Sequence, residues 1–354
     1  MKLCSYLAAL MAGRILGSLL VLVGILQILD LLEVTTDILD RELGGGGIAY
    51  YALLRMPRLV EQAAPLAVLT GSLFAFAKLA QESAVTAMRS TGVSAYQITL
   101  MALPAAVVMA VVQLTISGAV APRTDQTLSD WWRATEPAAE AKADAEKPDI
   151  LTFRVGDEVM VGEASADGRT LSKLTIYRRD AAGRLTQRTH ADSAVYDTGR
   201  WRLIAPRFET IQRDAIQTGS ADEMDWRVKL TPEDLQMLRA GQPTVTPAEA
   251  RRAVQGGVSV RPRTFYDTQL QRAWAAPAAC LVMLLLAAPA ALTNIRGGAP
   301  VLVLCLTGGL LFLVFDGAFT ALGENGAAPA ILAAWAAPAM FAALGVTALL
   351  YMEG

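Results

Sequence analysis

The sequence predicts a membrane protein in which an antiparallel β domain is inserted between two sets of three transmembrane helices. Two observations lead to this fold class. The 354 residues are 53% hydrophobic and only 18% charged, which is more apolar than a soluble protein of this size needs. Most of the 31 Lys and Arg residues lie between residues 123 and 263. The chain therefore divides into a membrane part at 1–122, a polar part at 123–267 and a second membrane part at 268–354.

Six apolar stretches are long enough to cross the hydrocarbon layer of a bilayer, which takes about 20 residues of α-helix. They cover residues 11–32, 62–80, 97–120, 274–292, 299–321 and 329–351. The third contains Pro104 and is predicted to end at Ala121 and Pro122, and the sixth contains Pro338. Proline is tolerated inside such helices where neighbouring helices satisfy the freed carbonyl group.

The Lys and Arg residues beside the spans predict the orientation, because cytoplasmic segments carry an excess of positive charge. One side is marked by Lys2, Arg14, Lys78, Arg89 and Arg296, whereas the opposite orientation is favoured by Arg41, Arg55 and Arg58. The balance places both termini and the links at 81–96 and 293–298 in the cytoplasm. The segment 33–60 and the whole domain 123–267 then lie outside.

The polar domain has the pattern of a β structure. Short segments rich in Val, Ile, Thr and aromatic residues are separated by turn residues such as Asp167-Gly168 and Thr198-Gly199. Since no long helices separate the segments, we expect an antiparallel sheet folded as a sandwich or a roll. A short helix is predicted from Pro232 to Leu238, with loops at 136–148 and 240–262. The predicted strands are 151–155, 158–164, 171–179, 189–197, 200–211 and 224–230.

The sequence contains no motif that indicates an enzyme. There is no GxxxxGK(S/T) loop for the phosphates of ATP, and the single histidine, His190, has no metal-ligand spacing around it. No serine-hydrolase motif accompanies it. Asp30 and Asp316 do not suit an intramembrane aspartyl protease, since neither is expected at mid-membrane. We therefore predict no catalytic residue, no metal site and no cofactor, and the net charge of −2 indicates no nucleic-acid partner.

Ionisable residues at the depth of a span are costly and need an explanation. Asp316 lies towards the far end of the fifth span. One explanation is that it reaches the outer interface or bonds to a neighbouring span. The other is that it lines a polar path for a substrate, and the sequence leaves both open.

Five segments, in order along the chain, form a pattern that extends over nearly the whole sequence. They are LAQESAVTAMRSTGVSAYQI (79–98), VAPRTDQTLSDWWRA (120–134), MDWRVKLTPEDL (224–235), QLQRAWAAPAACLVMLLLAAP (269–289) and FDGAFTALGENGAAPAILAAWAAP (315–338). With these segments and six spans around one β domain, the chain resembles the LptF/LptG family of lipopolysaccharide export permeases. The last segment is more similar to LptG than to LptF.

The resemblance implies a function and a set of partners. Members of this family work as a pair of related permeases with two copies of a cytoplasmic ATPase, and they extract lipopolysaccharide from the outer leaflet of the bacterial inner membrane. The partners implied are a second LptF-like chain, an LptB-like ATPase dimer, and LptC-like and LptA-like bridge proteins in the periplasm. The absence of a phosphate-binding loop agrees with this resemblance, which implies that ATP is hydrolysed on another chain.

The resemblance also implies roles for particular residues. Spans 1 and 5 would form a gate to the lipid, and the small residues Gly308 and Gly309 allow close approach of helices. Candidates for the cavity or gate are therefore Asp30, Gly308 and Asp316. The inserted domain would be a periplasmic β-jellyroll with an apolar interior, and its candidate lining residues are Leu151, Phe153, Leu174, Ile176 and Leu203. The same five residues would equally make an ordinary core.

The chain departs from the family near the outer end of the first span, where some members carry lysines that can meet the phosphates of lipid A. Gln27, Asp30 and Glu33 stand there instead, and Gln269 replaces a glutamate that many members have. Arginine can bind phosphate through two parallel hydrogen bonds. The candidates for the lipid head group are therefore Arg133, Arg261, Arg263 and Arg272. Alternatively, these arginines only mark the interface or pair with the acidic first span.

The link QESAVTAMRSTGVS (81–94) joins the second and third spans. Residues 82–90 are predicted to form a short helix with Val85 and Met88 on one face, and Gly92 suits the left-handed conformation that ends a helix. On composition alone this is a simple interfacial turn. The resemblance implies instead a coupling helix near 82–91 that contacts the ATPase through Glu82, Val85, Met88 and Arg89.

Two other functions are compatible with the sequence. One is a membrane-anchored β domain that senses or tethers a partner. The other is a permease that transmits motion without moving cargo through its own spans. An anchor needs only one or two helices, so six spans with polar residues inside them favour a transport path.

Overall fold

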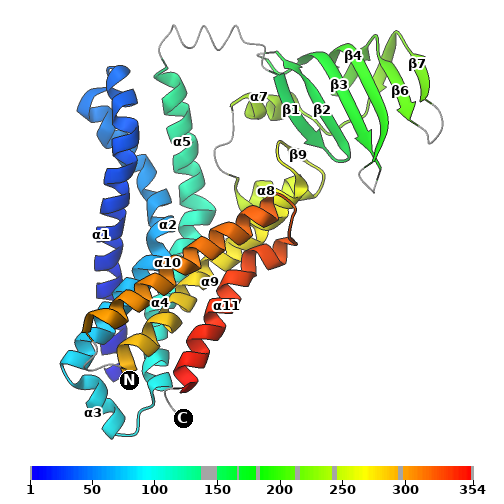
Figure 1. Cartoon of the computed structure of the whole chain (residues 1–354). Helices are drawn as coiled ribbons and strands as arrows, with labels where there is room; N and C mark the ends of the chain where they lie inside the picture. Colours follow the sequence, from blue (N-terminus) through cyan, green and yellow to red (C-terminus); the bar gives the residue numbers. More distant parts are fainter. Residues whose placement is uncertain are drawn as a thin grey trace. The chain divides into compact units, whose positions relative to one another are not determined.

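A computed structural model describes residues 2–136, 150–165, 167–180, 184–211, 216–240, 245–293 and 298–351. The chain divides into two compact units, Met1–Arg133 with Thr268–Gly354, and Ala134–Asp267. The first unit is helical and the second contains the sheet (Figure 1). The loop predicted at 136–148 lies almost entirely outside the described residues, as does most of the 293–298 link.

The helical unit contains the six helices predicted as spans, and all six are long and apolar enough to cross a membrane. In the helical unit, both termini lie at one end, and the links α1–α2 and α10–α11 lie at the other (Figure 1). The six helices are α1 (Lys2–Asp40), α2 (Gly44–Gln81), α4 (Ala95–Thr115), α9 (Arg263–Thr293), α10 (Gly298–Glu324) and α11 (Ala330–Tyr351).

The first two helices are much longer than the apolar stretches inside them. At 1.5 Å per residue, the 39 residues of α1 extend for about 58 Å, against about 30 Å for the hydrocarbon layer. The segment 33–60, predicted to lie outside the membrane, is helical except at the link 41–43. Positive φ angles at Glu42 and Gly44 turn the chain sharply there. The glycines at 44–47 form the first turn of α2.

The helix of the third span continues past Ala121 and Pro122, where the span was predicted to end. The helix continues from α4 through a π-helical turn, η1 (Ile116–Val120), into α5 (Ala121–Ala134). A proline normally breaks a helix because its ring clashes with the carbonyl group four residues earlier, although it is tolerated in a first turn. The wider π turn directly before Pro122 relieves that clash. The boundary between the two units consequently lies at residue 133 rather than at residue 122.

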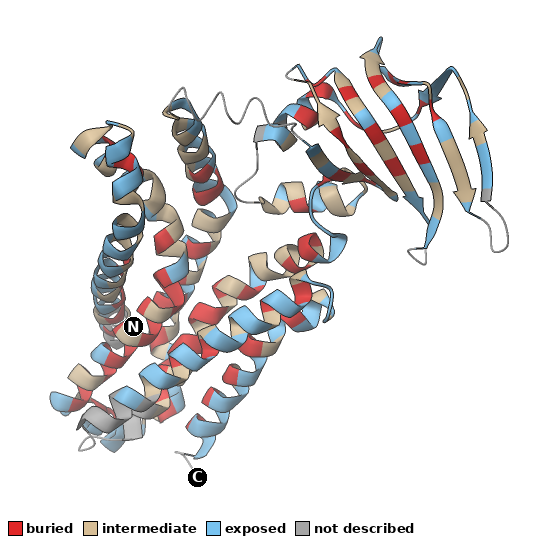
Figure 2. Ribbon diagram, turned by 45° about the horizontal axis from the view of Figure 1, so that its top comes forward, coloured by how far each residue is buried: buried red, intermediate tan, exposed pale blue. Residues whose placement is uncertain are grey.

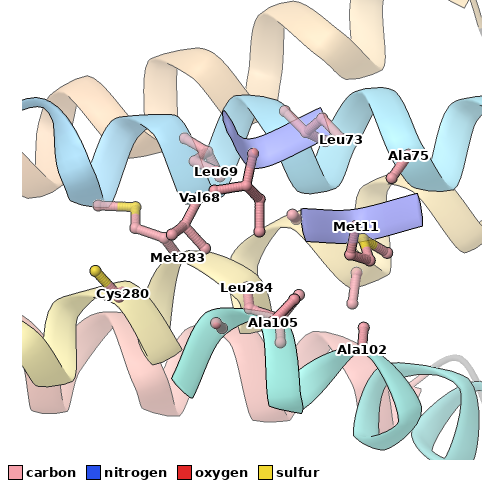
Figure 3. Close-up of a cluster of buried hydrophobic side chains, with 14 of the residues drawn as sticks. Met11, Val68, Leu69, Leu73, Ala75, Ala102, Ala105, Cys280, Met283 and Leu284 are labelled. Atoms are coloured by element: carbon pink, nitrogen blue, oxygen red, sulfur yellow. The ribbon is translucent and has the colours of Figure 1, made fainter. Parts of the chain in front are cut away.

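α2 is the central helix of the bundle. In its most apolar window 72% of the residues are buried, compared with 17% in the corresponding windows of α1 and α10. Much of the core consists of aliphatic and small side chains from α1, α2, α4 and α9, among them Met11, Leu69, Ala105 and Met283 (Figure 3). Where the surrounding solvent is lipid, such close packing rather than hydrophobic exclusion holds helices together.

The inserted domain is built on one antiparallel sheet in its described part, which confirms the predicted strand class. Hydrogen bonds join the strands in the order β7-β6-β4-β3-β2-β1-β9, and β5 and β8 continue from β4. β4 pairs with β6 along 187–190 and with β5 along 193–197. The strands are β1 (Ile150–Val155), β2 (Glu158–Ala164), β3 (Thr170–Arg179), β4 (Leu185–Asp197), β5 (Arg200–Ile204), β6 (Arg207–Ile211), β7 (Ile216–Ser220), β8 (Glu223–Trp226) and β9 (Val258–Ser259).

One face of this sheet covers a hydrophobic core, so buried and exposed residues alternate along the strands (Figure 2). Trp201 is 1% exposed, and its indole N–H donates to the carbonyl group of Leu230 at 2.9 Å. Leu235 of α7 (Pro232–Ala240) packs into the same core. The short helix predicted at 232–238 is therefore present and covers the sheet.

Several details of the polar domain were predicted wrongly. The strand predicted at 200–211 is divided into β5 and β6, because Ala205 has a φ of 48° and Pro206 follows it. The strand predicted at 224–230 ends at residue 226. The loop predicted at 240–262 contains β9 and α8 (Pro247–Val254), which begins with a capping box of Thr246 and Glu249. The Thr-Pro-x-Glu pattern of the capping box indicates the start of a helix and could have been recognised in the sequence.

Candidate functional site

The predicted coupling segment forms α3 (Ala84–Ser90), at the same end of the bundle as the termini (Figure 1). Gly92 follows it with a φ of 87°, the left-handed conformation that the sequence predicted. The helix begins two residues later than predicted, because Ser83 has a φ of 58° and interrupts it. Glu82 instead caps the C-terminus of α2, with its carboxylate 3.7 Å from the ammonium group of Lys78.

Val85 and Met88 face the bundle rather than the outside. Val85 is 0% exposed and Met88 8% exposed, and both belong to the core of the helical unit. The opposite side of the segment is exposed at Glu82, Thr86 and Arg89. In this structure Val85 and Met88 therefore anchor α3 to its own chain. The surface left for a partner is polar and charged.

Asp30 is held by two side chains of α2. The hydroxyl group of Tyr51 donates to Oδ2 of Asp30 at 2.9 Å, and Nε of Arg55 donates to Oδ1 at 3.2 Å. These bonds join the C-terminal part of α1 to the N-terminal half of α2. Arg55 opposed the predicted orientation, and its ion pair with the partly buried Asp30 explains why it stands there.

Arg41 and Arg58 also have partners in the helical unit. Arg41 donates to the carbonyl group of Trp132 at 2.6 Å, and its guanidinium carbon lies 4.2 Å from the centroid of the Trp132 ring. Arg58 pairs with Glu61 at 3.0 Å. The three arginines that favour the opposite membrane orientation, Arg41, Arg55 and Arg58, thus all bind nearby side chains or carbonyl groups.

An aromatic cluster that was not predicted from the sequence lies around Arg41. The ring centroids of Tyr50 and Trp131 are 5.3 Å apart, those of Trp131 and Trp132 5.8 Å, and those of Tyr51 and Trp132 6.3 Å. Paired aromatic residues at the ends of apolar segments are typical of membrane interfaces. The Tyr-Tyr and Trp-Trp pairs were therefore an available signal.

Asp316 is bound by Arg272 of the neighbouring helix. Nη2 of Arg272 lies 3.1 Å from Oδ2 of Asp316, and Nη1 donates to the hydroxyl group of Thr320 at 2.6 Å. Gln269 donates to Glu324 at 2.8 Å. Of the two explanations for Asp316, the structure shows the bond to a neighbouring span. These bonds join α9 to α10.

The two glycines of α10 have different surroundings. A Cβ atom on Gly309 would lie 2.2 Å from a methyl group of Leu69, whereas one on Gly308 would meet nothing within 4 Å. α10 therefore approaches α2 closely at Gly309, where the end of the Leu69 side chain would have to move to admit a larger residue. Gly308, the predicted cavity or gate residue, lies beside open space in this chain.

Asp125 in α5 is a buried acid that was not predicted from the sequence as a site residue. It is 5% exposed, and neither carboxylate oxygen has a hydrogen-bond partner among the described residues. Asp125 shares a helix face with the buried residues Ala121 and Pro122. Glu61 of α2 lies in the electrostatic field of Arg58, Asp125 and Arg272.

Of the four arginines predicted to bind the head group, one is bound within the helical unit and three are exposed. Arg272 has its guanidinium committed to α10, as described above. Arg133 is exposed and pairs with Asp130 at 2.7 Å. In the second unit, Arg263 is exposed and lies 3.7 Å from Asp267, and the exposed Arg261 lies 4.3 Å above the ring of Phe265. Three of the four thus remain accessible.

The five residues predicted to line the interior of the β domain gather in one place. They come from three strands, and the structure brings them together in the core beneath the sheet. Leu151 is partly buried at the edge of that core, and the other four are 5% exposed or less. The described residues contain no group of three or more acidic, His or Cys side chains that could hold a metal ion.

The outer faces of α1 and α10 are the most extensively exposed apolar surfaces of the helical unit. Leu20 and Leu32 are 67% and 71% exposed, and Val303 and Val314 are 61% and 66% exposed. Such faces contact acyl chains or another helix when the bundle lies in a bilayer. These are the two helices that the resemblance assigned to a gate.

Comparison with known proteins identifies the family. The family model of the lipopolysaccharide export system permease LptF/LptG matches residues 5–351. The lipopolysaccharide export system permease protein LptG of Haemophilus influenzae is 26% identical over 238 residues, which cover 65% of this chain and 64% of the relative. The protein of the same name from Escherichia coli K12 is 26% identical over 192 residues, 53% of this chain and 52% of the relative.

The aligned part thus spans between about half and two thirds of these curated relatives. The family match is broader, because it includes all six apolar helices and the inserted sheet. The chain belongs to the LptF/LptG family of lipopolysaccharide export permeases.

Proposed function

We propose that this chain is a permease subunit of an ATP-driven transporter in the bacterial inner membrane. It extracts lipopolysaccharide from that membrane and passes it to a periplasmic bridge towards the outer membrane. The observation that carries the proposal is the family match over residues 5–351. The names of the two relatives support lipopolysaccharide as the cargo. The same match favours transport over an anchor or sensor role.

The exposed faces of α1 and α10 are where we place the second, LptF-like permease chain and the lipid. A molecule with several acyl chains needs apolar walls and an opening to the bilayer. α1 and α10 supply such walls, because only 17% of their most apolar windows is buried within the chain. Asp30 and Gly308 lie on these two helices, and the position of Gly308 beside open space supports a role at the gate.

The exposed side of α3 is where we place the contact with the LptB-like ATPase dimer, which requires both termini to be cytoplasmic. Glu82 and Arg89 carry opposite charges on this side, whereas Val85 and Met88 hold the helix in place from below. A rigidly anchored helix transmits movement of a partner to the spans more directly than a mobile loop does. The coupling function is therefore divided between two exposed charges and two buried side chains.

Anionic groups of lipid A are proposed to meet the accessible arginines. Arg133 follows the third span, and Arg261 and Arg263 precede the fourth, so all three lie in chain segments next to membrane crossings. Guanidinium groups suit phosphate in charge and in geometry. Arg272 is omitted from this set because Asp316 and Thr320 already occupy it.

The β domain is proposed to be a jellyroll that receives the acyl chains in its interior and passes them to LptC-like and LptA-like bridge proteins. Ile176 and Leu203 lie in the core beneath the sheet, which supports their role as lining residues. Photocrosslinkers at these two positions should capture lipopolysaccharide only while ATP is hydrolysed. Crosslinks elsewhere in the domain but at neither position would contradict this path.

Co-purification tests the proposed assembly. The tagged chain, extracted from native membranes, should bring down an ATPase and a second six-span chain. The charge reversals Glu82→Lys and Arg89→Glu should reduce the recovered ATPase several-fold and leave the second permease bound. Arg123→Glu, an exposed reversal on α5, is the matched control. Full ATPase recovery with both α3 variants would contradict the coupling role of the segment.

A further inference from the structure

Gln113 is a buried amide in the middle of the helical unit. Its residue is 3% exposed, and the predicted third span around it, residues 97–120, contains no charged residue. Both hydrogen bonds of its amide group leave α4. Nε2 donates to the backbone carbonyl group of Glu61 in α2 at 3.2 Å, and Oε1 accepts from the thiol of Cys280 in α9 at 3.2 Å. One side chain therefore joins three of the long helices.

The carbonyl group of Glu61 lacks its usual partner, because a proline stands four residues later. In a regular α-helix the N–H of residue 65 would donate to this carbonyl group. Pro65 lies inside α2 and has no N–H, and its ring crowds the same carbonyl group. Helices bend most easily at such positions. Gln113 thus supplies from α4 the hydrogen bond that α2 cannot make for itself.

The replacement bond matters because it lies in the interior of the bundle. Pro65 is buried, as Gln113 is. An unsatisfied carbonyl group in hydrocarbon is costly, and proline inside a span is tolerated where a neighbouring helix provides the missing donor. The thiol of Cys280, which is 0% exposed, engages the amide oxygen and leaves the amide N–H groups of Gln113 for Glu61. The orientation of the amide is therefore fixed from both sides.

α2 is the helix through which a movement of α3 would reach the rest of the bundle. Its C-terminal segment, residues 66–81, leads into α3 after a turn of two residues. Its N-terminal segment, residues 44–64, is bonded to Asp30 of α1 through Tyr51 and Arg55. The proline separates the two segments. A helix that bends at this point absorbs a displacement of one segment, whereas a stiff helix passes it to the other.

We propose that Gln113 is a positioning residue for transport, because it stiffens α2 at Pro65 and so allows a movement of α3 to reach the N-terminal segment of α2. It acts through the backbone of α2 and does not touch the cargo. The transport part of this inference rests on the proposed function. The stiffening is a property of the helical bundle and requires no cargo.

The test is a distance measurement between two spin labels on α2, with the chain and its partners in lipid nanodiscs. Leu53 and Phe74 are 63% and 53% exposed and lie on either side of Pro65. In a straight helix their separation would be about 32 Å, at about 1.5 Å per residue. Labels attached through unnatural amino acids leave Cys280 in place. Gln113→Leu removes both hydrogen bonds at similar volume and should broaden the distance distribution several-fold.

Pro65→Ala is the compensating change, because the alanine restores an N–H that can bond the carbonyl group of Glu61 within α2. In this background Gln113→Leu should leave the distribution close to that of the wild type, so the two changes should not add. Pro338→Ala, at a proline inside α11, is the matched control and should not compensate. Equal broadening by Gln113→Leu with and without Pro65→Ala would overturn the proposal. So would an unbroadened distribution in Gln113→Leu alone.

Folding itself decides the case in which Gln113→Leu does not yield a folded protein. The double variant with Pro65→Ala should then fold, because the carbonyl group of Glu61 is satisfied again. A double variant that also fails to fold would contradict the proposal.

The lipopolysaccharide released per ATP hydrolysed separates positioning from stability. This ratio should fall several-fold in Gln113→Leu and recover in the double variant with Pro65→Ala. A ratio unchanged in Gln113→Leu, despite a broadened distribution, would contradict the positioning role. If the intact chain released no lipopolysaccharide, the proposed function would fail while the stiffening stood. If it released lipopolysaccharide and Gln113→Leu broadened nothing, only this inference would fail.

Discussion

Val85 and Met88 show what the sequence reveals at the scale of single residues and what it leaves open. The spacing of these side chains predicted one apolar face correctly. It did not reveal which surface covers that face, since the chain's own bundle and a partner protein offer the same apolar environment. The conformation of Gly92 was predictable because it depends on local backbone sterics alone.

Met88→Ala should destabilise the helical unit, because it leaves a cavity where α3 meets the bundle. Large-to-small changes at buried methionines cost about 2–5 kcal/mol. Thermal unfolding in detergent should therefore shift to lower temperature. Arg89→Ala, an exposed change one residue away, is the control and should leave the unfolding temperature unaltered. Equal stability of the two variants would show that α3 is not anchored.

Asp167 gives the β domain a pH dependence whose direction can be predicted. Its carboxylate accepts hydrogen bonds from the Ser165 hydroxyl group and the Arg169 backbone N–H, which lower the pKa of Asp167. A group whose pKa is lower in the folded state stabilises the fold above the unfolded pKa, about 3.9 for Asp. This contribution is lost as the pH falls through the folded pKa.

Asp167→Asn should therefore remove part of the loss of stability seen on acidification below about pH 4. The effect is small, since the carboxylate is fully exposed. Thermal unfolding of the β domain within the full chain, followed at a series of acidic pH values, measures it. Asp192→Asn, at an exposed position of β4, is the comparison. The same pH dependence in both variants would show that the turn contributes nothing.

At the scale of elements, apolar content located the spans but not the ends of the helices. Hydropathy marks the part of a helix that lies in hydrocarbon, whereas the helix itself continues wherever its backbone hydrogen bonds do. α1 and α2 therefore extend past their apolar runs, and α5 continues past Pro122 because a π turn precedes the proline. β9 was missed since two residues carry no periodic signal. The capping box of α8, in contrast, was overlooked although it was present.

The packing of α1 against α2 depends on Gly71. A Cβ atom there would lie 2.5 Å from the Cα of Ile15, in the backbone of α1, so the helices would have to separate. Overpacking of this kind costs about 1–3 kcal/mol. We expect Gly71→Ala to lower the unfolding temperature in detergent. Gly308→Ala, whose Cβ would meet nothing within 4 Å, is the matched control. No difference between the two would contradict the close approach.

At the scale of the whole molecule, the two units follow from how charge is distributed along the chain. Apolar segments at both ends form one bundle, and the charged middle forms an independent sheet domain. This division was predictable because it needs only composition. Three features of the helical unit were not predictable from composition, because each depends on which helix faces lie together. They are the bonds of Asp30 to Tyr51 and Arg55, the pair of Arg272 and Asp316, and the buried position of Asp125. The gate candidates therefore came from the family resemblance, as the cargo did, and the structure added the side chains that two of them, Asp30 and Asp316, bind.

The central claim is that this chain moves lipopolysaccharide out of the inner membrane. The most direct measurement is the amount of lipopolysaccharide in separated inner and outer membranes after the chain is depleted from its native cells. We predict a several-fold rise in the inner membrane and a matching fall in newly delivered material in the outer membrane, both reversed by the intact chain. An unchanged distribution in fully depleted cells would contradict the account.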